Sequence, residues 1–180
     1  MTRLPLLTDD QVGPPDLVAD IRQRRGGGLL DLDRLLLHSP AFATGWNELM
    51  GRVRGALHVP ALLRELAMCG VAALTGAEFE MFHHAPLYLA AGGSADQLAA
   101  LHKLSGTAAD AIAADPVFDA DQQAVLRLVV EMTRDVRVSD ATFERARAVL
   151  GSDARIFELV AVIAAYNMVA RILVVMKLTP

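Results

Sequence analysis

Residues 64–101 read RELAMCGVAALTGAEFEMFHHAPLYLAAGGSADQLAAL, and they predict two consecutive helices joined by a tight turn. We expect the first helix to run from Pro60 to about Leu74 and the second from Ala77 to Ala91. Thr75-Gly76 and Gly92-Gly93 end them, because glycine readily adopts the backbone conformation that closes a helix. The two helices form a hairpin at the centre of the chain.

Polar side chains interrupt the apolar faces of this hairpin. On the first helix Glu65 falls on the apolar face, one turn before Cys69, because residues three and four apart are neighbours. On the second helix Glu80 and His84 also lie one turn apart. An ionised carboxylate buried without a partner costs several kcal/mol, so Glu65 needs a proton, a cation or hydrogen-bond donors. We therefore expect the hairpin to bring His84 to Glu65, in a catalytic group with Glu80.

Other interpretations of these residues stay open. Glu80 and His84 can form an ordinary exposed ion pair, with Glu65 capping another group. Two carboxylates and an imidazole also suit several divalent ions, but nothing here matches HExxH or another metal-binding pattern, so we expect no metal and no cofactor. Phe79 and Met81 are expected in the core or in a pocket wall, and Ala77 is a further expected pocket residue.

On the N-terminal side, residues 1–38 are expected to be an arm of the same domain. Asp16–Arg25 predicts a short helix, which Gly26–Gly28 ends. Ser39-Pro40 then predicts the start of an amphipathic helix, with Phe42, Trp46, Leu49, Val53 and Leu57 at helical spacing.

On the C-terminal side, two capping boxes announce further helices. Ser94–Gln97 and Asp119–Gln122 each carry the required residues at both ends. A short helix is expected at 143–150 and a long one at 156–178. No stretch shows sustained strand alternation, so the prediction is one all-α domain spanning residues 1–180.

The last predicted helix carries polar residues on its apolar stripe. Asn167 and Arg171 either contact a carboxylate or helix-end carbonyls, as at a subunit interface, or bind the carboxylate of a substrate. Glu158 and Lys177 add further charge, which is costly at the centre of a bilayer. We therefore expect a core or interface helix and no membrane association.

The composition limits the classes of partner. With a net charge of −4, the chain of 180 residues lacks the basic surface that nucleic acid requires. A mean hydropathy of +0.35 with 5% aromatic residues indicates a surplus of aliphatic surface, from which we expect a homo-oligomer. The single cysteine cannot form an internal disulfide, and the N-terminus lacks a secretory signal, so a cytoplasmic location is the expectation.

Residues 64–101 resemble the carboxymuconolactone decarboxylase family, which includes the AhpD-like alkylhydroperoxidases. LLHSPAFATGWNELMGRVR at 36–54 and AYNMVARIL at 165–173 are also similar to that family's flanking helices. The resemblance implies an all-helical AhpD-like bundle with a central hairpin that assembles into dimers, trimers or hexamers.

The redox members of that family carry a glutamate followed by C-x-x-C-x-x-x-H. By resemblance the glutamate falls on Glu65, the two cysteines on Ala77 and Glu80, and the histidine on His84. Both thiols are thus missing, and dithiol peroxidase chemistry needs both. Cys69 lies two turns before the first of these positions and is expected to be a buried, weakly nucleophilic pocket residue.

Three hypotheses follow. The first is a lyase-like enzyme of the carboxymuconolactone decarboxylase type, which uses Glu65, Glu80 and His84 for decarboxylation, isomerisation or lactone opening on a small anionic metabolite. The second is a peroxidase that uses Cys69 alone. The third is a non-catalytic helical assembly or small-ligand binding module.

Overall fold

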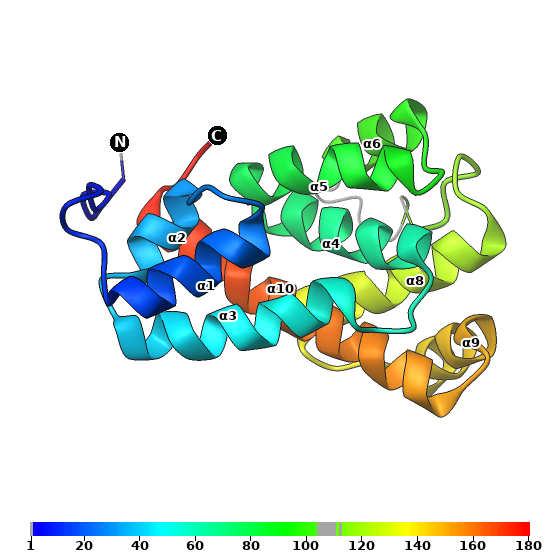
Figure 1. Ribbon diagram of the computed structural model, residues 1–180. Helices are drawn as coiled ribbons and strands as arrows, with labels where there is room; N and C mark the ends of the chain where they lie inside the picture. The colour runs from blue at the N-terminus through cyan, green and yellow to red at the C-terminus, as the bar shows by residue number, and fades with distance from the viewer. Residues whose placement is uncertain (1, 104–110, 112) are drawn as a thin grey trace. The chain divides into compact units, whose positions relative to one another are not determined.

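The computed structural model describes residues 2–103, 111 and 113–180 of the chain, and in that part every regular element is a helix (Figure 1). This confirms the all-α fold class. The described residues of Met1–Leu57, with Val175–Leu178, form one compact unit, and those of His58–Val174, with Thr179–Pro180, form another. A single domain over 1–180 stays a prediction.

The first unit contains α1 (Pro15–Arg25), α2 (Asp31–Leu36) and α3 (Pro40–Gly55). Both α1 and α2 lie within the expected arm and pack on α3. The buried Asp33 accepts hydrogen bonds of 2.9 Å from Nε and Nη2 of Arg25 and from the backbone N–H of Leu30. This paired carboxylate ties α1 to α2, which the sequence pattern did not predict.

The predicted stripe of α3 is partly wrong. Trp46 and Val53 are buried as expected, but Phe42 and Leu49 are exposed. Ala43 and Met50 complete the buried face instead. The buried face of α3 is therefore turned slightly from the predicted one. The prediction followed the largest apolar side chains, whereas the small Ala43 allows close packing on the face that is buried.

The second unit is organised around α4 (Ala61–Thr75), which packs against α5 (Glu78–Ala90), α6 (Ala95–His102) and α8 (Ala120–Val130) (Figure 1). The turn between α4 and α5 closes at Gly76, whose φ of 69° lies in the left-handed region that favours glycine. The expected central hairpin is therefore confirmed. Both predicted capping boxes are also present, at the start of α6 and of α8.

The remaining elements follow α8. A single π-helical turn, η2 (Glu131–Asp135), leads to α9 (Asp140–Leu150) and then to the long α10 (Asp153–Met176). By length and composition, α10 is the one helix in the described ranges able to cross a membrane, and half of its most apolar window is buried inside the fold. The helices expected at 143–150 and 156–178 correspond to α9 and α10.

Candidate active site

The hairpin buries a carboxylate and an imidazole side by side. Glu65 on α4 and His84 on α5 are each 5% exposed. Oε2 of Glu65 lies 2.7 Å from Nδ1 of His84, which is the contact expected from the sequence. Glu80 is 3% exposed, so the alternative of an exposed Glu80–His84 surface pair is wrong.

The other face of the imidazole meets a residue from the last helix. The hydroxyl of Tyr166 on α10 lies 2.9 Å from Nε2 of His84, and the two rings meet edge to face with centroids 4.9 Å apart. Tyr166 is completely buried. Glu65, His84 and Tyr166 thus form a continuous hydrogen-bonded row, which we call the Glu65–His84–Tyr166 chain.

The proton positions that fit this chain follow from the donors and acceptors. When Nδ1–H of His84 donates to Glu65, Nε2 of the neutral imidazole is the acceptor for the Tyr166 hydroxyl. Arg64 places its guanidinium nitrogens 3.4 Å from Oε1 of Glu65. Both carboxylate oxygens therefore face a donor, which offsets the cost of burial.

Cys69 lies inside the same cluster, one turn after Glu65. Burial, with the added negative charges of Glu65 and Glu80, raises the pKa of the Cys69 thiol to about 12. Cys69, Glu65 and Glu80 are all buried on the two helices of the hairpin. At neutral pH the thiol is protonated and therefore a poor nucleophile.

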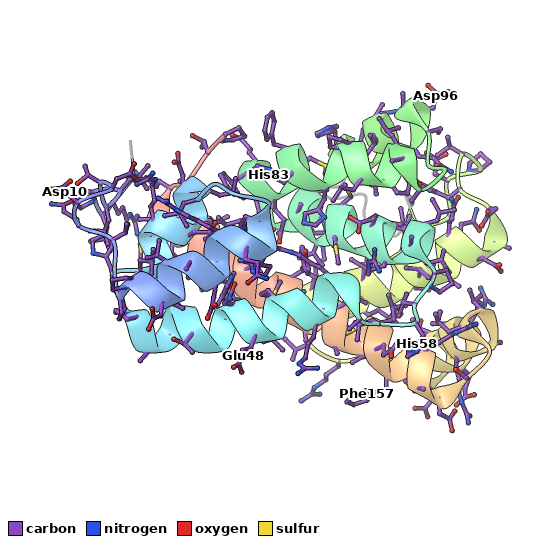
Figure 2. The ribbon with its side chains drawn as sticks, viewed as in Figure 1. Asp10, Glu48, His58, His83, Asp96 and Phe157 are labelled. Atoms are coloured by element: carbon purple, nitrogen blue, oxygen red, sulfur yellow. The ribbon has the colours of Figure 1, made fainter. Side chains whose placement is uncertain are left out.

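An apolar groove of about 700 Å³ opens beside this region, between the end of α4, α5 and His102 of α6. Ala77 and Met81, two of the expected pocket residues, line it together with Phe82 and Leu89. Cys69 is instead buried within α4, and Phe79 packs its ring 4.4 Å from that of His83 (labelled in Figure 2).

Asn167 and Arg171 form a second polar group on α10. Nη1 of Arg171 donates to the backbone oxygen and to Oδ1 of Asn167, at 2.8 and 2.7 Å. Nδ2 of Asn167 donates to Oγ1 of Thr133 on η2 at 3.0 Å. Because successive helix residues point about 100° apart, Tyr166 faces His84 while Asn167 faces η2. Substrate binding by this pair stays a prediction.

The candidate site residue that sequence reasoning missed is Tyr166. It belongs to the AYNMVARIL segment, where only Asn167 and Arg171 were singled out as polar. A tyrosine on an apolar stripe looks like core packing, although a buried phenol usually needs a hydrogen-bond partner. Within the described residues, no three His, Cys, Asp or Glu side chains gather in a group that could hold a metal ion.

Known structures resemble this arrangement of helices. An uncharacterized peroxidase-related protein from Silicibacter sp. TM1040 superposes with a TM-score of 0.78 at 18% identity, over 99% of this chain and 91% of its own. An uncharacterized peroxidase-related protein from Ralstonia eutropha JMP134, described as an alkylhydroperoxidase AhpD core, gives 0.77 at 14% identity, over 99% and 92%. The chain has the AhpD-like fold.

At these identities the likeness concerns the AhpD-like fold alone. No protein-family model matches the sequence, and no curated protein matches it either. The chemistry that this AhpD-like fold supports must therefore be argued from its own side chains.

Proposed function

We propose that this protein is an enzyme that performs non-thiol acid/base chemistry on a small anionic metabolite, as in decarboxylation, isomerisation or lactone opening. The observation that supports it is the Glu65–His84–Tyr166 chain, in which a buried imidazole bridges a carboxylate and a phenol. The arrangement follows the logic of a catalytic triad, with a phenol in the place of the usual hydroxyl nucleophile.

Each member of the chain has a defined role in this proposal. Glu65 holds His84 in the tautomer that leaves Nε2 free to accept, and it stabilises the imidazolium that forms. Tyr166 passes its proton to Nε2, and its oxygen then accepts a proton from the substrate; the reverse transfer delivers a proton to the product. Because Tyr166 is fully buried, the substrate reaches it only when neighbouring side chains move.

Glu80 and Arg171 are given further roles in this proposal. Glu80 is a second buried carboxylate of the hairpin and can take up or deliver a second proton. Arg171 would hold the carboxylate of the substrate through its Nε and Nη2 edge, since Nη1 is bound to Asn167.

Thiol peroxidase chemistry has less support. By the family resemblance, Ala77 and Glu80 occupy the two cysteine positions of the redox members. Cys69 is completely buried and its pKa is raised to about 12, so the attacking thiolate is scarce at neutral pH. That alternative would be supported if the protein consumed hydroperoxide with an external thiol and lost this activity in Cys69→Ser.

The test begins with a thermal-shift screen of small lactone and carboxylic acids, because selective binding stabilises the folded state. Compounds that stabilise the protein are then assayed for turnover. Tyr166→Phe removes one hydroxyl and preserves the ring, and we expect it to lower kcat by about 100-fold or more. His84→Ala should abolish turnover, at a larger cost in stability because it leaves Glu65 without the imidazole.

The matched control is Tyr88→Phe. Tyr88 is also fully buried, and its hydroxyl donates to Oε1 of Gln97 at 2.6 Å. This variant should lose similar stability and keep its turnover. If Tyr166→Phe and His84→Ala turn over substrate as fast as Tyr88→Phe does, the proposed relay is wrong.

A further inference from the structure

A second hollow region lies between α8 and α9, and it shares no residue with the Glu65–His84–Tyr166 chain. The two helices pack together but leave one hollow of about 460 Å³ and another of about 260 Å³. Ala124, Arg127 and Arg145 line both. The hollows therefore adjoin, with the two arginines in their common wall.

The sequence explains why this space is open. Each helix presents two alanines and one arginine at positions i, i+4 and i+7, which share one helix face. These residues are Ala120, Ala124 and Arg127 on α8, and Ala141, Arg145 and Ala148 on α9. Alanine has no atoms beyond Cβ with which to fill the gap, so the walls are apolar and shallow except at the guanidinium groups.

The carboxylate of Glu131 lies close enough to Arg127 for the guanidinium charge to help lower the pKa of Glu131, but its hydrogen bonds go to other residues. Glu131, in the wall of the smaller hollow, accepts from the backbone N–H of Ser139 at 2.8 Å and from the hydroxyl of Thr142 at 2.5 Å. Glu144 pairs with Arg147. Across residues 2–103, 111 and 113–180, no carboxylate oxygen lies within 4.0 Å of a guanidinium nitrogen of Arg127 or Arg145. Neither guanidinium is held in a close ion pair by a described residue, so each can still bind an anion.

We propose that these adjoining hollows bind a small organic acid, with its anionic group between Arg127 and Arg145 and its apolar body against the alanines. Guanidinium groups pair with carboxylate or phosphate oxygens through two parallel hydrogen bonds, which favours an anion here. The combined space falls in the range that small-molecule sites occupy. Asp121 lines the larger hollow and Glu131 the smaller one, and both carboxylates repel the anion and limit the affinity.

The test is a titration of the full chain with benzoate, hexanoate and inorganic phosphate. Binding is measured by calorimetry and by the NMR chemical shifts of residues in α8 and α9. Arg127→Gln and Arg145→Gln should each raise the Kd about tenfold or more, which corresponds to about 1.4 kcal/mol. Asp121→Asn should lower it. Arg155→Gln, an exposed arginine on α10 outside both hollows, is the matched control and should leave the Kd unchanged.

Two further measurements distinguish the apolar wall of the site from its anion-binding part. Ala148→Leu places a larger side chain at an exposed position of the larger hollow and should weaken benzoate and hexanoate, but not phosphate. Saturable binding of phosphate alone would identify a phosphorylated ligand. The proposal is overturned if none of the three anions binds saturably. It is also overturned if Arg127→Gln and Arg145→Gln, each with the circular dichroism of the wild type, still bind the anions as tightly. None of the substituted residues belongs to the proposed relay, so either proposal can fail alone.

Discussion

At the scale of single residues, burial acts on two neighbouring acids of α4 with different results. Burial disfavours any charged side chain. Glu65 meets this cost with donors from His84 and Arg64, whereas Cys69 keeps its proton because its pKa is raised to about 12. The same buried environment therefore keeps Glu65 paired with His84 and opposes thiolate chemistry at Cys69.

This difference predicts slow alkylation of Cys69 in the native protein. With a pKa about three units above the ordinary value of 9.0, the thiolate at pH 8 is about 1,000-fold scarcer than in the unfolded chain. Iodoacetamide at pH 8, followed by mass spectrometry, should label the protein slowly in buffer and quickly in guanidinium chloride. Equal rates in the two conditions would contradict the burial of the sulfur.

The pH dependence has a definite sign. The folded-state pKa of Cys69 lies above its unfolded value, so its contribution to stability is complete below about pH 9. It is lost as the pH rises toward 12, because the unfolded chain releases the thiol proton first.

At the scale of elements, the link between α5 and α6 depends on a close backbone approach. Tyr88 is fully buried, and its hydroxyl reaches Gln97, whose Nε2 in turn donates to Oε1 of Gln122 on α8 at 2.8 Å. Gly93 passes directly over the tyrosine ring: a Cβ added there would lie 2.3 Å from Cε1 of Tyr88. The glycine therefore allows one tyrosine and two glutamines to tie three helices together.

Gly93→Ala should destabilise the fold. The added methyl group must displace the buried ring and disturb its hydrogen bond to Gln97, at a cost of about 1–3 kcal/mol. Urea denaturation followed by circular dichroism measures the change.

The matched control is Gly45→Ala, inside α3, where an added Cβ meets nothing within 4 Å. It should stabilise the helix by up to about 1 kcal/mol. A Gly93→Ala variant as stable as Gly45→Ala would show that the ring moves freely.

At the scale of the whole molecule, apolar surface remains exposed on α5. Phe82, Leu87 and Leu89 are 61%, 51% and 43% exposed. Phe82 and Leu89 lie seven residues apart and therefore share one face of the helix, and exposed apolar side chains favour association, as the surplus of aliphatic residues in the sequence also suggested. The homo-oligomer stays a prediction, and α5 is the surface on which we expect it.

Light scattering after size exclusion should give the mass of a dimer, trimer or hexamer. Phe82→Glu should lower that mass while the helical content stays the same, because a charge buried without a partner opposes association. Phe157→Glu is the control: Phe157 is 72% exposed and projects from α10 (Figure 2). A monomeric wild-type protein at 50 µM (about 1 mg/ml) would contradict the prediction.

The sequence by itself determined the local structure and half of the candidate site. The hairpin, both capping boxes and the approach of His84 to Glu65 follow from spacing along neighbouring helices, where period and chain connection limit the geometry. The short helix α2 escaped prediction because its six residues are too few to show a period.

Only the tertiary structure decided which distant residues meet. Tyr166 lies 82 residues from His84, and no local pattern distinguishes it from core packing. The same holds for Arg127 and Arg145, which share a hollow because α8 and α9 pack with their alanines facing the gap. A helix pattern shows which face is buried, but the neighbour that covers that face is chosen by packing across the whole fold.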